Sequence, residues 1–279
     1  MERKESIGRG RSGRSVLNLD SIQSRKGKEG RKSRDLKLSI VKNLGEGIVL
    51  SRIAYSESSW VIQCFTREHG LKSFLVQGGK KKYASQIQAL SHIEFSYSQK
   101  HEDQLARMYE IQDATNQSAI RFDPVRSSIC FFEAEFVRQC VHEGHPDLPL
   151  YDFLCQEIQY LSAHDQLANY VIYWVLEMTR LLGFQPQVID DRANYFDLQQ
   201  GELGWQRDPM TDPKLVIEDE TVPVLAQLLK LNKEGILQQA LPKAIRQQLL
   251  EHLLRFMRTQ HNAFREIKSL AVYQTLWYE

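Results

Sequence analysis

The chain has 279 residues, of which 42% are hydrophobic and 25% charged, an ordinary globular composition with room for one or two domains. No run of 18 or more apolar residues occurs, which excludes a membrane-spanning helix. The N-terminus lacks the apolar core of a signal peptide, and the four cysteines, which are widely spaced among apolar neighbours, are typical of reduced thiols. We therefore expect a cytoplasmic protein.

The formal net charge of +1 conceals an uneven distribution. Residues 1–37 carry 12 Lys and Arg against 5 Asp and Glu, whereas residues 38–279 carry 24 against 30. Any polyanion that the body binds must therefore meet a local basic patch. The first segment is rich in Arg, Gly and Ser and poor in apolar side chains, so we expect a disordered basic tail over residues 1–37. A nucleic-acid-binding arm and a dispensable extension from a mis-assigned start both remain open.

Short strand-like runs fill the next part of the chain. Three lie between Gly47 and Tyr83, separated by Ser-rich and Gly-containing turns. A fourth alternates around Ile93, Phe95 and Tyr97, and a fifth covers residues 107–114. Apolar side chains occur on both faces of the first three runs, as in a closed or helix-covered barrel. The sequence thus predicts a five-stranded antiparallel barrel of the oligonucleotide-binding (OB) type over residues 38–120.

From Asp123 onward the apolar residues repeat at helical spacing, which predicts an all-helical domain over residues 121–279. The most regular stripe extends from Leu167 to Leu182 and ends at Gly183, as expected for the central helix of a bundle. Residues 184–216 contain three prolines and two glycines and are expected to form an irregular insertion that could include a hairpin at Gly201. The predicted fold class is α+β.

Few residues suggest bond-making chemistry. The sequence has no nucleophile elbow, phosphate-binding glycine loop or Cys-x-x-Cys pair, so we expect a protein that is not an enzyme and needs no cofactor. Two weak metal-ligand groupings occur, but the first lacks an evident fourth ligand and the second is explained by solvated acidic loop residues, so no metal is predicted. The first grouping is Cys140, His142 and His145; the second is Asp190, Asp191 and Asp197.

A basic constellation is more informative. Lys80, Lys81 and Lys82 follow the third strand in an expected loop after two glycines, and Tyr83 comes next. Lys72 and Arg52 can face the same side of the predicted sheet. Cations beside an exposed aromatic ring on such a barrel bind single strands by charge and by stacking, the latter contributing ~1–3 kcal/mol per base. These six residues are the predicted DNA-binding site, with a merely solvated lysine loop as the alternative.

Three stretches make the chain resemble the RecO family of bacterial recombination mediators. The first is GIVLSRIAYSESSWVIQCFTREHGLKSFLVQGGKKK, with the family's turn residues at Tyr55 and Glu57 and at Thr66 to Gly70. The second is Leu-Leu-Gly-Phe at residues 181–184, which alone would be weak. The third is HNAFREIKSLAVYQTLW, which contains the family's Lys-Ser-Leu segment. Together they anchor the resemblance over residues 45–277.

The resemblance implies an N-terminal OB barrel, a helical C-terminal domain and a cytoplasmic, nucleoid-associated protein of DNA repair. It implies binding of single- and double-stranded DNA, strand annealing, contacts with RecR and with the acidic tail of the single-stranded DNA-binding protein, and help in loading RecA. Many family members carry a zinc-binding cysteine cluster after the Leu-Leu-Gly segment. This chain has Asp190 and Asp191 there and no cysteine, so zinc is expected to be absent.

Two other functions remain open from the sequence. One is a barrel-plus-helix adaptor that binds proteins and meets nucleic acid only incidentally. The other is a metal enzyme built on the Cys140 or Asp190 groupings, which bound metal in stoichiometric amount would favour. Cations of the helical part are candidates for the acidic tail by charge alone, and ordinary solvated helix ends explain them as well. They are Lys230, Lys233, Lys243 and Arg246.

Overall fold

The computed structural model describes residues 42–101 and 104–278. The expected basic tail over residues 1–37 lies outside them. Among the described helices, none combines the length and the apolarity needed to cross a bilayer.

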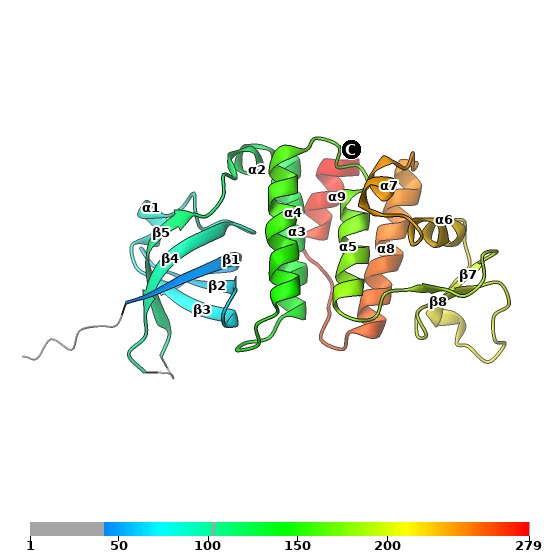
Figure 1. Ribbon diagram of the computed structural model, residues 1–279, viewed down its shortest axis with the longest axis horizontal. Helices are drawn as coiled ribbons and strands as arrows, with labels where there is room; N and C mark the ends of the chain where they lie inside the picture. The colour runs from blue at the N-terminus through cyan, green and yellow to red at the C-terminus, as the bar shows by residue number, and fades with distance from the viewer. Residues whose placement is uncertain (1–41, 102–103, 279) are drawn as a thin grey trace, which may run out of the picture. The chain divides into compact units, whose positions relative to one another are not determined.

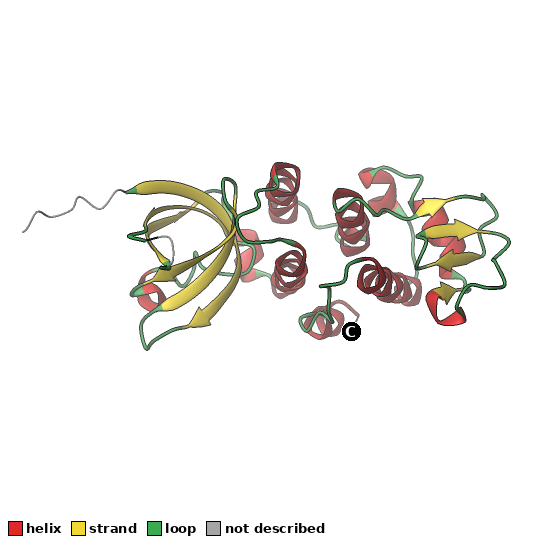
Figure 2. Cartoon of the chain, turned by 90° about the horizontal axis from the view of Figure 1, so that it is seen from below, coloured by secondary structure: helices red, strands yellow, loops and turns green. Residues whose placement is uncertain are grey.

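Five strands form a closed barrel (Figures 1 and 2). Around the barrel the order is β1-β2-β3-β5-β4, and β4 pairs back onto β1. The predicted barrel is therefore confirmed, with one correction: β3 and β5 run parallel, with Phe74 opposite Ala106, so the barrel is mixed. A pattern of apolar residues does not encode which edges meet on closure. The strands are β1 (Asn43–Ala54), β2 (Trp60–Thr66), β3 (Gly70–Val76), β4 (His92–Ser98) and β5 (Ala106–Asp113).

The two apolar faces of these strands serve two cores. Inward-facing side chains such as Val49, Ile62 and Phe74 fill the barrel interior. Outward-facing side chains such as Ile48 and Phe65 are equally buried, because they belong to the core of the helical part. The barrel is thus helix-covered on one side, as the two-sided apolar pattern predicts.

The helices that follow the barrel build the second core. Helix α3 begins at Pro124 because the Asp123 carboxylate accepts hydrogen bonds from the amides of Val125 and Arg126. Helix α5 is central as predicted, since Trp174 is fully buried among aromatic rings from α3 and α4. The helices are α1 (Gly79–Lys82), α2 (Ser118–Phe122), α3 (Pro124–Cys140), α4 (Leu148–Ala163), α5 (Tyr170–Leu181), α6 (Thr221–Leu228), α7 (Lys233–Gln238), α8 (Lys243–Gln260) and α9 (Leu270–Tyr278).

The insertion after α5 is not wholly irregular, and the C-terminal part is not all-helical. A small sheet of order β6-β8-β7-β9 forms there, with the hairpin at Gly201, whose φ is 72°. The ring of Phe196 packs 5.1 Å from that of Phe256 in α8. Strands of two or three residues are too short to show an alternating pattern, so the sequence did not predict them. They are β6 (Gln187–Val188), β7 (Tyr195–Asp197), β8 (Glu202–Gly204) and β9 (Val216–Ile217), with a 3₁₀ turn η1 (Pro213–Leu215) before β9.

The segment before α9 docks on α3. Glu135 accepts hydrogen bonds from the backbone amides of Lys268 and Ser269 and from the Ser269 hydroxyl. Phe264 and Tyr273 are buried on either side of these bonds. The Lys-Ser-Leu segment therefore caps α9 and fastens it to the bundle.

Candidate nucleic-acid interface

The three consecutive lysines belong to α1, a single helical turn, and not to a loop. Gly78, with a φ of 67°, permits the reversal after β3 that starts the turn. The Lys80 amide donates to the Ser58 carbonyl at 3.4 Å, and its ammonium donates to the Ser56 carbonyl at 2.8 Å. Helix α1 is thereby joined to the turn between β1 and β2. Lys81 and Lys82 extend into solvent.

Arg52 lies at the same end of the barrel. The pairing of β1 with β2 slips by one residue between Val49 and Ser51, so Arg52 pairs with Ile62, whose side chain points into the barrel. Strict alternation would have placed Arg52 on the face of Ile48 and Leu50. Its guanidinium donates to the Ile87 carbonyl at 2.7 Å and lies 5.0 Å from the centroid of the Trp60 ring.

Lys72 is elsewhere. On β3 it pairs with Cys64 of β2. Val76, four residues farther along β3, pairs with Trp60, so Lys72 lies about 13 Å along the strand from the Trp60 end of the barrel. Its ammonium lies 5.1 Å from the centroid of the Tyr97 ring, and partial burial lowers its pKa. The prediction that Arg52, Lys72 and the lysine triplet share one surface is therefore wrong for Lys72.

The prediction that the Tyr83 ring stacks on bases is also wrong. Its side chain is 6% exposed, belongs to the barrel core, and accepts a hydrogen bond from the Glu110 amide at 3.1 Å. Because Tyr83 points inward and closes the barrel core after the turn of α1, no face of its ring is open to a base. The exposed aromatic at this end is Tyr55.

Two cations of this end, Arg52 and Lys80, are held by carbonyl oxygens and not by carboxylates. Within the described part of the chain, no carboxylate lies within 4 Å of the charged atoms of Arg52, Lys80, Lys81 or Lys82. None of the four is therefore neutralised by an ion pair, although the Tyr83 hydroxyl and, at longer range, the charge of Glu110 raise the pKa of Lys82. We call Arg52, Lys80, Lys81 and Lys82 the basic end.

An acidic groove lies on the β1, β4 and β5 side of the barrel. Glu46 and Glu94 stand directly opposite each other on paired strands, and Glu68 and Glu110 also line the groove. Such a face repels phosphates, so we expect no nucleic acid to bind along this groove.

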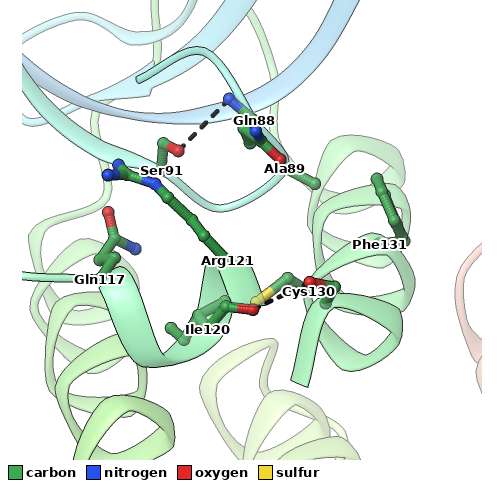
Figure 3. A pocket seen from close by; sticks show the side chains of 9 residues that line it. Gln88, Ala89, Ser91, Gln117, Ile120, Arg121, Cys130 and Phe131 are labelled. Carbon is green, nitrogen blue, oxygen red and sulfur yellow. Dashed lines mark hydrogen bonds between the residues drawn. The ribbon is translucent and has the colours of Figure 1, made fainter. Parts of the chain in front are cut away.

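A small hollow lies between the barrel and the first helices (Figure 3). Arg121 reaches toward Ser91 and Gln117 in it, and the Arg121 Nε is buried without a described hydrogen-bond partner. The volume of about 20 Å³ is enough for a single water molecule between these polar groups.

The two metal-ligand groupings do not come together. Within residues 42–101 and 104–278, no three His, Cys, Asp or Glu side chains are arranged to hold an ion. Burial raises the pKa of the Cys140 thiol to about 12. Asp190 and Asp191 form ion pairs with Arg192 and Lys230.

Comparison with known proteins decides the family. The family model described as Recombination protein O N terminal matches residues 43–116, and that described as Recombination protein O C terminal matches residues 121–270. The chain belongs to the RecO family. It is therefore a protein of recombinational DNA repair, as the resemblance implied.

Individual RecO proteins are similar over nearly their whole length. The DNA repair protein RecO of Flavobacterium psychrophilum is 30% identical over 232 residues, which cover 81% of this chain and 95% of that protein. The RecO of Flavobacterium johnsoniae is 28% identical, covering 83% and 98%. The RecO of Bacteroides fragilis is 28% identical, covering 83% and 97%.

Proposed function

We propose that this RecO-family chain is a non-enzymatic mediator that binds single- and double-stranded DNA, anneals complementary strands and helps load RecA onto DNA coated by the single-stranded DNA-binding protein. Its proposed protein partners are RecR and the acidic C-terminal tail of the single-stranded DNA-binding protein. Annealing needs two polyanions brought together, which cationic side chains achieve without a catalytic group.

The observation that supports this proposal is the state of the cations at the basic end. Arg52 and Lys80 are positioned by the carbonyls of Ile87 and Ser56, which leave their charge free for phosphates. Elsewhere, many cations are neutralised by ion pairs, as Arg67 is by Asp152 and Lys233 by Glu157. A barrel end with fixed cations that no described carboxylate neutralises is suited to a phosphate backbone.

The test is a triple substitution of Lys80, Lys81 and Lys82 by Ala. Each phosphate contact contributes about 0.7 to the slope of log affinity against log salt for a single strand, so the slope should become shallower by about 2. The matched control replaces Lys214, Lys243 and Lys268 by Ala, since these remove the same charge from exposed positions outside the barrel. An unchanged slope in the barrel variant would remove α1 from the interface.

A strand-annealing assay separates this proposal from the adaptor function. The mediator anneals complementary strands at low salt and less well at moderate salt, and the triple barrel variant loses this activity. A protein that binds partner tails but neither binds nor anneals DNA is an adaptor.

A further inference from the structure

The basic end carries one large aromatic side chain that the barrel leaves unused. Tyr55 is 67% exposed, whereas Trp60 is half-buried and Tyr83 is buried. The Tyr55 side chain makes no hydrogen bond or ring contact within the part of the chain that the structure describes. Its neighbour Ile53 is 63% exposed, so the tip of the β1–β2 hairpin presents an apolar surface to solvent.

This tip is an ordered turn and not a loose loop. The Tyr55 amide donates to the Ser59 carbonyl at 3.0 Å, and the Ser59 amide donates to the Ser56 hydroxyl at 3.1 Å. The backbone carbonyl of Ser56, the next residue, accepts the hydrogen bond from the Lys80 ammonium. Ser56, the residue after Tyr55, is thus tied to Lys80 of the basic end. The backbone of Tyr55 is fixed beside it, and only the side chain of Tyr55 is free to rotate.

An exposed ring beside fixed cations matches the chemistry of an unpaired nucleotide. The cations attract the phosphate, while the ring offers a face to the base. In a duplex both faces of each base are already covered by stacked neighbours, so the ring has little to bind. Ring and cations together thus distinguish unpaired bases from paired ones.

We infer that Tyr55 is a base-stacking residue that gives the basic end its preference for unpaired nucleotides. This inference rests on the proposed function, because it assigns a substrate class to the same site. It replaces Tyr83, whose buried ring cannot take this role.

Three probes of equal length test the inference: an oligothymidylate, an abasic strand with the same phosphates but no bases, and a duplex. Tyr55→Ala should weaken binding of the oligothymidylate by about five- to hundred-fold, the loss expected for one stacked base. Binding of the abasic strand and of the duplex, and the salt slope for each probe, should stay unchanged. Tyr55→Trp should restore oligothymidylate binding. The control Phe122→Ala removes an aromatic side chain that is 88% exposed outside the barrel and should leave all three affinities unchanged.

The outcomes separate the inference from the function on which it rests. If Tyr55→Ala weakens binding of the abasic strand and of the oligothymidylate equally, or changes the binding of neither, Tyr55 does not stack on bases and the inference is wrong. If the triple lysine variant still lowers the salt slope in that case, the proposed function stands without it. If Tyr55→Ala instead weakens only a protein partner, the tip is a protein contact and the inference is likewise overturned. If the lysine variant leaves the affinity for every probe unchanged, α1 is not part of the interface; if the native chain binds none of the three probes, the proposed function itself fails.

Discussion

Replacing Glu133 by Gln should change how the free energy of unfolding depends on pH. Glu133 lies on α3, 1% exposed, and neither carboxylate oxygen has a hydrogen bond of acceptable geometry to a described residue. Burial raises its pKa well above the ordinary value, the charge of Glu157 raises it further, and Tyr170 and Lys233 oppose them. The folded chain therefore keeps the proton on Glu133 at pH values at which the unfolded chain has already released it.

The sign follows from proton binding in the two states. As the pH rises above about 4.5, the unfolded chain releases the proton of Glu133 while the folded chain keeps it, so this group makes stability fall with pH. The slope is about 1.4 kcal/mol per pH unit up to the raised pKa. Gln keeps the shape of the side chain but has no proton to release. Relative to the native chain, Glu133→Gln should therefore gain stability steadily as the pH rises from about 5 toward the raised pKa of Glu133.

Urea denaturation followed by circular dichroism at pH 5, 6, 7 and 8 measures this difference. Glu157→Gln is the control, because Glu157 accepts two hydrogen bonds from the Lys233 ammonium at 2.7 and 2.9 Å and its loss leaves that cation without a carboxylate. That variant should lose about 3 kcal/mol at pH 7. Parallel pH curves for the native chain and Glu133→Gln would show that Glu133 ionises normally in the fold, and the reasoning would be refuted.

Two further substitutions test the barrel. Gly70→Ala should lower the free energy of unfolding by about 2–4 kcal/mol in the same urea titration, because φ is 63° and an added Cβ would lie 2.1 Å from the His145 carbonyl oxygen; a loss below that of an exposed-site Gly78→Ala control would contradict this contact. Tyr83→Phe should cost about 1–2 kcal/mol, because the Glu110 amide, on a residue with a φ of 54°, loses its acceptor. It should leave DNA affinity by fluorescence anisotropy unchanged, and a weakened affinity would return Tyr83 to the interface.

The barrel and the central helix were predictable because their signals are repeated many times along the chain. Apolar residues on both faces of β1 to β3 indicated a barrel covered by helices, and the stripe that includes Trp174 indicated a buried helix. The parallel contact between β3 and β5 and the small sheet after α5 were not predictable. The first depends on how the barrel closes, and the second consists of strands only two or three residues long.

The site was only partly predictable, for a different reason. Arg52 points to the expected end of the barrel only because the register of β1 slips beyond Val49, and a single-residue bulge leaves no trace in the alternation of side chains. Tyr83 and Tyr55 look alike in the sequence, but one closes the core and the other faces solvent. The exposure of an aromatic ring is decided by the contacts of its neighbours, which become known only in three dimensions.

The number of cations at the basic end also bounds how the proposed mediator can work. If all four contact phosphates of a single strand, the slope of log affinity against log salt is about −3, and a fourfold rise in salt lowers affinity about fifty-fold. The carboxylates of the acidic groove, Glu46 and Glu94 among them, add a repulsive field. A site of this strength releases a strand readily, which annealing requires, and cannot by itself hold the protein on DNA. The proposed contacts with RecR and with the single-stranded DNA-binding protein would then supply localisation, while the basic end supplies only the brief neutralisation that lets two strands meet.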